Sequence, residues 1–420
     1  MTREFDIVLF GATGFVGAIT AGHLSHQARA DGTGPRIALA GRSPAGLEAV
    51  RAGLGRAAAA WPLVTVDAED PAGLRALAAR TRVLVSTVGP YAVHGRDVVA
   101  ACAETGTHYA DLTGEVLFVR WSLDHVAARA ARTGARIVHA CGFDSIPSDL
   151  GVLVTAQRAA ADGAGTLTDT VLAVRSLRGG LSGGTIASGR AQAVTARSDP
   201  AARRTIEDPY GLSPRRGEEP ARGERRARGF AGTLHRLLPV RRDPATGRWA
   251  GPFVMAPFNT RIVRLSNTLT DWSYGRDLRY REVVDFGSGP AAPLLATGLA
   301  VGLGVALAGL SHGPDAVLDR VLPRPGSGPG AARRAAGHFR MEIRATTTTG
   351  ARYRTTFAAP LDPGYDGTAV MLGQSALCLA LDAGLPDRAG VLTPATAMGG
   401  PLVDRLRRCG FTIQVDRLAD

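Results

Sequence analysis

Residues 5–17 read FDIVLFGATGFVG, and this stretch decides the fold. An apolar run ends at Gly11, two further glycines follow at three-residue steps, and helix-forming residues continue after Gly17. The pattern predicts a strand, a tight glycine turn and the start of a helix. Glycine allows an anion to approach the main chain, and the free N–H groups of a helix N-terminus attract that anion. The stretch therefore predicts a turn that binds the pyrophosphate of a dinucleotide.

The spacing of the glycines is Gly-x-x-Gly-x-x-Gly, which on its own would also fit an ordinary turn in another α/β fold. Its context favours the dinucleotide site, because the first 150 residues alternate between apolar strands and helical stretches. Strands are expected at 5–10, 37–40, 63–66, 83–87, 108–112 and 136–140, and helices at 14–30, 44–54, 71–79, 95–104 and 116–131. This alternation predicts an α/β protein whose residues 1–150 form a doubly wound parallel sheet of the Rossmann type.

The composition limits the chemistry. The chain has 420 residues, enough for two domains, and a formal charge of +12 that comes entirely from arginine, since it contains no lysine. A Schiff-base lysine, a Walker A lysine and a Tyr-x-x-x-Lys dyad are therefore excluded. The charge is typical either of codon bias or of attraction to anionic cofactors, acidic carrier proteins or an anionic membrane. No basic–aromatic alternation or zinc-ligand spacing indicates a nucleic-acid or metal site.

The cysteines and the N-terminus indicate the compartment. Cys102, Cys141, Cys378 and Cys409 lie far apart and form no Cys-x-x-Cys pair, as expected of reduced thiols in the cytosol. The N-terminus begins with acidic residues and a strand, which is unlike a signal peptide. We therefore expect a cytoplasmic protein.

The ends of the first three strands predict the cofactor. Ligands of a doubly wound sheet bind at the carboxyl ends of its strands. Arg42 and Ser43 follow the second strand, where Asp or Glu usually holds a free ribose hydroxyl, and an arginine fork suits a 2′-phosphate instead. This favours NADP(H), the alternative being an exposed arginine in an arginine-rich chain. Asp67 is expected to border the adenine. The expected contacts in the glycine turn are Gly11, Thr13, Gly14, Phe15, Val16 and Gly17.

The segment after the fourth strand is expected to lie near the nicotinamide. Its predicted cofactor contacts are Thr87, Val88, Gly89 and Pro90. Tyr91 and His94 follow, and both are candidate proton donors. Their structural alternatives are that Tyr91 packs on the cofactor and that His94 caps the next helix.

The ends of the last two strands carry further carboxylates. Asp111 and Glu115 lie between a strand and a helix, and we interpret them as caps for free N–H groups. Asp144 and Ser145 follow the sixth strand and could face the substrate. Asp144 is therefore a third candidate for proton transfer.

The remainder of the chain departs from this alternation. Residues 151–385 are expected to form an α+β domain for substrate binding or dimerisation, built on an antiparallel sheet, with a hairpin around Gly350. Residues 199–248 are rich in arginine, and we interpret them as a partly mobile surface insertion. Residues 386–420 are a C-terminal segment that could return to the dinucleotide domain.

Residues 286–314 contain no Asp, Glu, Lys or Arg. Their middle is long enough to cross a bilayer as a helix, although it is dominated by Ala and Gly and contains Pro293. Three interpretations remain open: a segment that dips into a membrane or contacts an acyl chain, a buried helical hairpin, and a full span.

Several motifs together resemble the saccharopine dehydrogenase-like oxidoreductases. They are the glycine turn, Val-Gly-Pro-Tyr at 88–91, Asp-Leu-Thr-Gly-Glu at 111–115, Cys-Gly-Phe-Asp-Ser-Ile-Pro-Ser-Asp at 141–149, Gly-Gly-Leu-Ser-Gly-Gly-Thr at 179–185 and the segment 364–377. Within that group the chain is most similar to the trans-acting enoyl reductases of actinobacterial lipid and polyketide synthesis.

The resemblance implies an NADPH-dependent reduction of an α,β-unsaturated acyl thioester, in which a hydride reaches the β-carbon and a proton the α-carbon. It also implies an acyl chain that arrives on the carrier domain of a polyketide synthase. Peripheral contact of residues 286–314 with the inner face of the plasma membrane and a homodimer are further expectations. The alternatives are an amino-acid dehydrogenase like the saccharopine enzymes and a non-catalytic NADP-binding protein.

Overall fold

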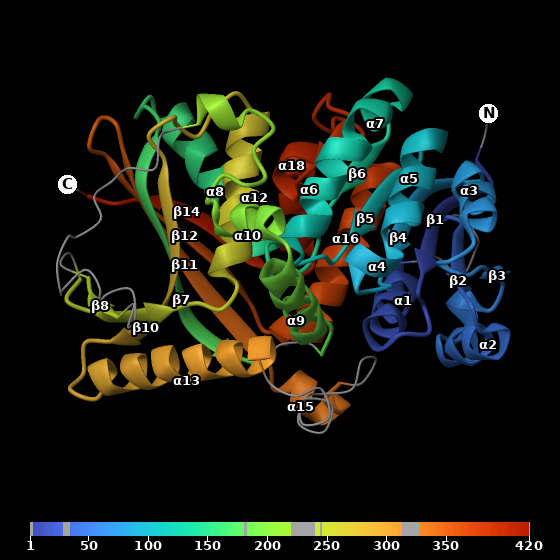
Figure 1. Cartoon of the computed structure of the whole chain (residues 1–420), viewed down its shortest axis with the longest axis horizontal. Coiled ribbons are helices and arrows are strands. Elements are labelled where there is room, and N and C mark those ends of the chain that lie inside the picture. Colours follow the sequence, from blue (N-terminus) through green and yellow to red (C-terminus); the bar gives the residue numbers. More distant parts are fainter. Residues whose placement is uncertain are drawn as a thin grey trace.

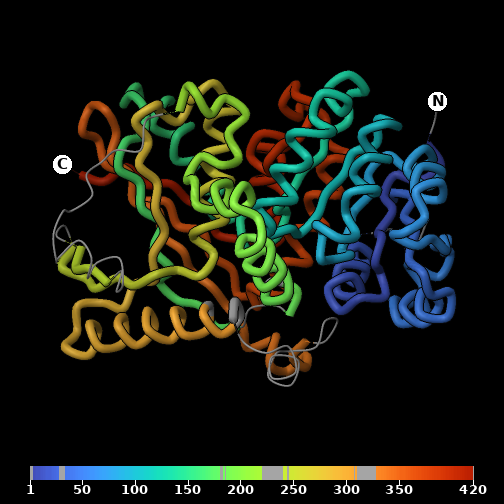
Figure 2. The backbone as a smooth tube through the Cα atoms, in the orientation of Figure 1, coloured from blue at the N-terminus to red at the C-terminus, as the bar shows by residue number. Residues whose placement is uncertain are grey.

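A computed structural model describes residues 3–27, 34–179, 183–219, 240–243, 246–312 and 328–419. Two seven-stranded sheets lie toward opposite ends of the long axis, and helices fill the space between them (Figures 1 and 2). The prediction of a Rossmann-type domain joined to a second α+β domain is confirmed.

The first sheet is parallel throughout its pairings. Its strands, in spatial order, are β13 (Gly390–Leu392), β6 (Arg136–Val138), β5 (His108–Asp111), β4 (Thr81–Ser86), β1 (Phe5–Phe10), β2 (Ile37–Gly41) and β3 (Leu63–Thr65). Apart from β13, this is the 3-2-1-4-5-6 order of dinucleotide-binding domains, in which the chain reverses direction between β1 and β4. The crevice at that reversal is where ligands of such sheets bind.

Helices cover both faces of this sheet because β1 alternates between them: Ile7 and Leu9 enter one hydrophobic cluster, and Val8 and Phe10 enter another. The helices of this half are α1 (Phe15–Gln27), α2 (Pro44–Gly53), α3 (Pro71–Ala79), α4 (Tyr91–His94), α5 (Arg96–Thr105), α6 (Val116–His125) and α7 (Ala127–Thr133), with a 3₁₀ turn at Arg56–Ala58. The helix expected at 116–131 is divided at Val126. Gly106 and Gly134 end α5 and α7 in the left-handed conformation that glycine favours at this position.

The second sheet is antiparallel except where β10 pairs with β7. Its strands, in spatial order, are β14 (Thr412–Arg417), β12 (Arg352–Ala359), β11 (His338–Thr347), β7 (Leu167–Arg178), β10 (Arg279–Gly287), β9 (Trp249–Pro252) and β8 (Arg241–Arg242). The predicted hairpin around Gly350 is β11–β12, and Gly350 has the positive φ that its turn requires. Residues 386–420 contribute to both sheets, through β13 and β14.

The chain after β6 supplies the remaining helices of the described residues. These elements are α8 (Ile146–Ala161), α9 (Gly183–Ser198), α10 (Pro200–Glu207), α12 (Ala256–Leu269), α13 (Ala292–His312), α15 (Ala331–Ala335), α16 (Thr368–Leu381), α17 (Pro394–Ala397) and α18 (Gly399–Arg408), with a 3₁₀ turn at Arg216–Glu218 and a π-helical turn at Pro363–Gly367.

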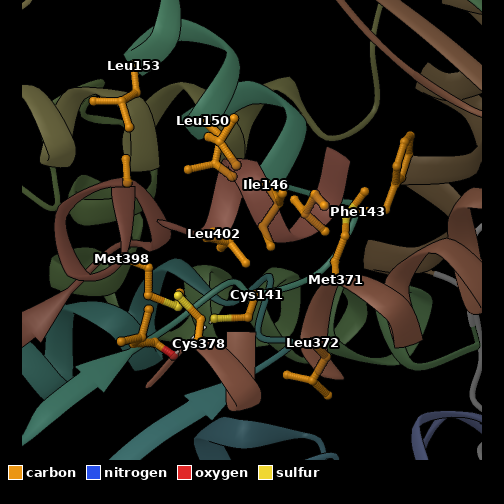
Figure 3. Close-up of a cluster of buried hydrophobic side chains, with 14 of the residues drawn as sticks. Cys141, Phe143, Ile146, Leu150, Leu153, Met371, Leu372, Cys378, Met398 and Leu402 are labelled. Atoms are coloured by element: carbon orange, nitrogen blue, oxygen red, sulfur yellow. Dashed lines mark hydrogen bonds between the residues drawn. The ribbon is translucent and has the colours of Figure 1, made fainter. Parts of the chain in front are cut away.

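One continuous hydrophobic core joins the two sheets. Ile146, Leu150 and Leu153 on α8 face Met371, Leu372 and Cys378 on α16, and Met398 and Leu402 close the cluster (Figure 3). The middle of α16 is buried on all sides, as expected of a helix that is apolar all round. Because both sheets share this core, the space between them has a fixed shape.

The structure describes part of the arginine-rich insertion, and it contradicts one interpretation of the apolar stretch. The described part of the arginine-rich insertion is folded: α10 is followed by a turn in which Leu212, Ser213 and Glu219 are buried. Glu219 accepts hydrogen bonds from Thr268 and from the indole nitrogen of Trp272, and these contacts fix the turn against α12. The apolar stretch forms one long helix, α13, so the buried-hairpin interpretation is wrong. Within the described ranges, no helix has both the length and the hydropathy to cross a membrane.

Candidate active site

A cavity of about 680 Å³ lies between the carboxyl edge of the parallel sheet and the helices of the second domain. One wall comes from the segments 14–17, 87–91, 112–116 and 140–144, which follow β1, β4, β5 and β6. The opposite wall comes from α9, Ile206 of α10, residues 253–258, and the π-helical turn near Tyr365. The cavity therefore occupies the place where the sheet topology predicts a ligand.

The glycine turn has no room for side chains. A Cβ atom on Gly11 would lie 2.7 Å from Val88, and one on Gly17 would lie 2.2 Å from the carbonyl oxygen of Gly11. Gly11 also has a φ of +88°, and the N–H of Gly14 donates to its carbonyl oxygen at 3.0 Å. The turn consequently presents the N-terminus of α1 to the cavity as bare backbone. This cradle fits a pyrophosphate.

The predicted ribose and adenine contacts lie at the surface beside this turn. Arg42 is exposed at the end of β2, while Ser43 accepts a hydrogen bond from the N–H of Gly46 at 3.1 Å and caps α2. Thr13 lies against this cap, because a Cβ on Gly46 would be 3.0 Å from its methyl group. The exposed Asp67 accepts from the N–H of Glu69 at 3.1 Å. The structure therefore brings Thr13, Arg42 and Ser43 to one end of the turn.

The segment after β4 connects the turn to the cavity. The Thr87 hydroxyl donates to the carbonyl oxygen of Gly11 at 3.0 Å. Val88 lies behind the turn, and a cis peptide bond joins Gly89 to Pro90 on the cavity wall. Thr87 and Val88 thus help to shape the glycine turn, while Gly89 and Pro90 face the open space.

Tyr91 is buried on the cavity wall, and its hydroxyl group is hydrogen-bonded to the backbone. The hydroxyl donates to the carbonyl oxygen of Ser86 at 3.1 Å and accepts from the N–H of Leu112 at 3.3 Å. Burial, reinforced by Asp111, raises the pKa of Tyr91 well above its usual value. This geometry favours a role for Tyr91 in positioning the ends of β4 and β5. His94 is half-buried at the end of α4 and is absent from the described cavity wall.

Two fully buried carboxylates hold the cavity wall together. Glu115 accepts from the N–H groups of Tyr91 at 2.9 Å and Ala92 at 2.8 Å, and from the hydroxyl of Ser188 on α9 at 2.6 Å. Its side chain thus caps α4, which precedes it in the chain, and does not cap α6, which follows it. The bond from Ser188 also connects the two walls.

Asp111 accepts from the N–H of Ala140 at 3.1 Å and from Nδ1 of His139 at 2.7 Å. Ala140 lines the cavity with a φ of +64°, which is an unfavourable conformation for a residue with a Cβ atom. The Asp111 bond helps to hold this conformation. Both carboxylates therefore have the capping role that the sequence predicted.

Behind Asp144, a polar network runs into the second domain. Asp144 is half-buried on the cavity wall. Ser145 donates to the side-chain oxygen of Asn259 at 3.0 Å, and the Asn259 amide donates to Glu282 at 3.0 Å. Burial raises the pKa of Glu282 to about 7, and Tyr280 donates to this carboxyl group at 2.8 Å. Ser145, the neighbour of Asp144 in the chain, thus joins a buried network that connects the start of α8 with α12 and β10.

The wall opposite the glycine turn is largely apolar. Ile186 and Ala193 of α9, Ile206 of α10, and Met255 and Phe258 line it. Arg261 is the one cationic side chain on the described cavity wall. Its guanidinium donates to the carbonyl oxygens of Asp208, at 3.0 Å, Pro257 and Ile206, so its charge holds α10 against α12.

A cluster around Phe15 connects the glycine turn to the second domain. The Phe15 ring contacts Tyr365 edge-on at 5.0 Å, and the Arg334 guanidinium lies 5.3 Å from the Phe15 centroid. Arg334 is in turn paired with Asp366 at 3.0 Å. The residue that opens α1 is therefore held by the segments around 334 and 365.

The fold and this cavity define a class: a dinucleotide-dependent oxidoreductase with its substrate space between two domains. Residues 7–140 match the family of the saccharopine dehydrogenase NADP binding domain. A trans-acting enoyl reductase of Mycobacterium bovis is 49% identical over 424 residues, covering 99% of each chain. A relative from Mycobacterium tuberculosis is 52% identical over 428 residues, also with 99% coverage of both.

The apo saccharopine dehydrogenase (L-Glu forming) of Saccharomyces cerevisiae has a similar fold, with a TM-score of 0.53, 13% identity, and coverage of 98% of this chain and 99% of that one. The chain belongs to the saccharopine dehydrogenase-like family, in the group of the mycobacterial trans-acting enoyl reductases. It is an NADP-dependent oxidoreductase, and NADP(H) is its cofactor.

Sequence reasoning missed several residues of the site. Arg261 lines the second wall, and Asn259 and Glu282 meet behind this wall only after α12 packs against α8 and β10. The sequence indicated no role in the site for Tyr365, although the Gly-Tyr pair in an otherwise apolar segment is a signal that could have suggested one.

Proposed function

We propose that this protein reduces the carbon–carbon double bond of an α,β-unsaturated acyl thioester with NADPH. The observation that carries this proposal is the apolar wall opposite the glycine turn. An acyl chain gains free energy from each methylene that leaves water, so such a wall suits it. The names of the mycobacterial relatives support the same reaction.

The cavity fits the saccharopine-type alternative less well. A dicarboxylic amino acid needs cationic groups that face it, and Arg forks are the usual partners of carboxylates. Arg261, the cation on the described wall, donates to three backbone carbonyl oxygens. The amino-acid dehydrogenase remains the alternative that the assay below tests.

The chain's own residues bind and orient the reactants. The bare backbone at Gly14 and Gly17 would hold the pyrophosphate, and Arg42 the 2′-phosphate. Gly89 and Pro90 would lie beside the nicotinamide. When bound, NADPH supplies the hydride. The apolar side chains of α9 and α12 exclude water from the acyl chain.

The α-carbon needs a proton, for which Asp144 and Tyr91 are the candidates. Asp144 is the better placed, because it is half-buried on the cavity wall, whereas the Tyr91 hydroxyl donates its proton to Ser86. We expect Asp144→Asn to lower kcat about 100-fold, within the range known for general acids. Tyr91→Phe should lower it less. Full turnover in both variants would reject the assignment.

The function is tested by following NADPH oxidation with trans-2-enoyl thioesters of coenzyme A and of an acyl carrier protein. Turnover of enoyl thioesters, with none of glutamate plus an aldehyde substrate, supports the proposal. The reverse result would establish the amino-acid dehydrogenase. NADPH binding without turnover of either class would establish the non-catalytic alternative. Faster turnover of the carrier-bound substrate would support a separate acyl carrier as the partner, as in polyketide and glycolipid synthesis.

The cofactor contact of Arg42 has its own test. Because the side chain is exposed, we expect Arg42→Ala to weaken NADPH binding about tenfold, or about 1.4 kcal/mol, and to leave NADH binding unchanged. Nicotinamide fluorescence measures both affinities. Equal loss for both nucleotides would place the 2′-phosphate elsewhere.

A further inference from the structure

Helix α13 carries its small side chains inside and its large ones outside. Ala292, Ala296 and Ala300 are 2%, 0% and 7% exposed and face the protein, where α13 packs against β9 and β10. Leu294 and Val305 are 76% and 68% exposed on the other side. A surface helix of a water-soluble domain has the opposite arrangement.

The outward face of α13 is a continuous apolar surface. At 100° per residue, the three buried alanines span a sector of about 80°, Leu294, Val301 and Val305 lie opposite it, and Leu295 and Leu299 lie on one flank. The glycines between them have open space where a Cβ would be. We call these five side chains the α13 face. A contiguous exposed apolar face of this kind marks an interaction site.

Basic side chains lie at both ends of the α13 face. Figure 1 shows β8 at one end of the helix and α15 at the other. β8 carries the exposed Arg242, and α15 the exposed Arg333. Asp285, the acidic residue of β10 next to the helix, is buried in ion pairs with Arg175 and Arg248. Among the described residues of β8 and α15, the exposed charged side chains are therefore arginines.

We propose that α13 is an interfacial helix that lies in the surface of an anionic lipid bilayer. The α13 face would enter the boundary between headgroups and acyl chains, and the arginines at its ends would contact lipid phosphates. A helix in this orientation does not cross the bilayer, in agreement with the absence of a spanning helix in the described part of the chain.

The same face fits a second copy of the chain less well. A stable protein–protein interface uses about 20–30 residues on each side, with aromatic anchors at its centre. The α13 face is a single helix without aromatic residues, and the exposed charged side chains of the described elements at its ends, Arg242 and Arg333, have the same sign. Two such faces would bring like charges together, whereas an anionic surface attracts them.

The position of α13 connects this surface to the cavity. α9, which forms part of the apolar cavity wall, also packs against α13. A bilayer on the α13 face would lie close to the cavity and to any acyl chain within it. This consequence rests on the proposed function, whereas lipid binding by α13 does not.

Vesicle co-sedimentation of the full chain tests the proposal. We expect it to pellet with vesicles of phosphatidylglycerol and phosphatidylcholine, and much less with phosphatidylcholine alone or at raised salt. Leu294→Glu should lower partitioning about tenfold, because it removes buried apolar area and adds a repelled charge. The control is Leu381→Glu, the same change at an exposed leucine on α16, which should partition as the wild type does.

Thermal unfolding and NADPH affinity, measured on the same samples, show whether both variants are folded. Absence of vesicle binding by the wild type would overturn the proposal. So would equal loss in the two variants. A dimer in light scattering that Leu294→Glu dissociates, without vesicle binding, would assign the α13 face to a second copy. Enoyl reduction can fail while vesicle binding persists, so the failure of either proposal is recognised separately.

Discussion

The two walls of the cavity differ in how the chain builds them. The wall at the glycine turn comes from four short segments that each follow a strand of the parallel sheet, and in the first of them Gly14 and Gly17 expose backbone to the cavity. The opposite wall is assembled from α9, α10, α12 and the turn near Tyr365, which are far apart in the sequence. The first wall presents N–H groups and the second presents apolar side chains.

The two walls constrain the amino-acid sequence to different degrees. A backbone cradle needs particular residues at fixed spacing, so it can be recognised from the sequence and does not tolerate substitution. An apolar wall needs only the right volume, which many sequences supply. A single substitution in the glycine turn should therefore abolish most ligand binding, whereas substitutions in the apolar wall should change ligand binding gradually with side-chain volume.

Gly17→Ala should disrupt the glycine turn and have the largest effect of the variants considered. The new Cβ would lie 2.2 Å from the carbonyl oxygen of Gly11, so the turn must open. We expect NADPH affinity to fall at least about 100-fold, or about 2.7 kcal/mol, in a fluorescence titration. The control is Gly22→Ala on the same helix, where nothing lies within 4 Å.

The control variant should keep its affinity and gain about 0.5–1 kcal/mol of stability from better helix propensity. Unchanged affinity in Gly17→Ala would show that the pyrophosphate does not lie on this turn.

Glu115→Gln tests the connection between the walls. The carboxylate accepts from two backbone N–H groups and from Ser188, whereas a carboxamide offers one acceptor oxygen and turns its NH₂ group toward donors. We expect the free energy of unfolding to fall by about 2–3 kcal/mol. Urea denaturation measures this change.

Glu104→Gln is the matched control, because Glu104 pairs with Arg75 and Arg129 at the surface. It should cost less than about 1 kcal/mol. A similar cost for both variants would mean that Glu115 does not fix α4.

The buried Glu282 behind the second wall gives a pH-dependent test. Burial raises its folded-state pKa to about 7, above its usual value. The folded protein therefore binds this proton more tightly than the unfolded chain, and the resulting stability is complete at low pH and lost as the pH rises through about 7. Wild type should lose about 2 kcal/mol relative to Glu282→Gln between pH 5 and 8.

Denaturation at each pH compares the two proteins, and Glu218→Gln at an exposed position controls for the loss of an acidic group. A constant difference between wild type and Glu282→Gln would show that Glu282 does not titrate in this range.

The same contrast explains what the sequence could predict. The doubly wound parallel sheet, the glycine turn and the β11–β12 hairpin follow from local patterns, and the structure confirms them. The capping role of Glu115 was predictable, but its target was not, because α4 reaches this carboxylate only through tertiary packing.

The second wall could not be predicted for a related reason. Its contacts join residues that are far apart in the sequence. Phe15 contacts Tyr365, and Ser145 is hydrogen-bonded to Asn259. The composition of residues 199–248 suggested a partly mobile surface insertion, and in its described part Arg215 stacks on Trp272 and helps to fold the segment against its neighbours. Composition describes a segment, but it does not say what the segment packs against.

Ala193→Leu tests the apolar wall, and of the four variants it should have the smallest effect. Ala193 faces the cavity from α9, so a leucine there would occupy volume that we assign to the acyl chain. We expect short enoyl thioesters to keep kcat/KM within about twofold, and longer ones to lose about fourfold for each displaced methylene. NADPH affinity should not change, because the glycine turn is unaffected.

Val194→Leu is the control, since Val194 is the next residue on α9 and is 52% exposed. The graded, length-dependent loss is what separates a wall defined by volume from one defined by backbone geometry. An equal loss at every chain length would mean that Ala193 acts through the fold of α9, and the acyl chain would then have to lie along α12.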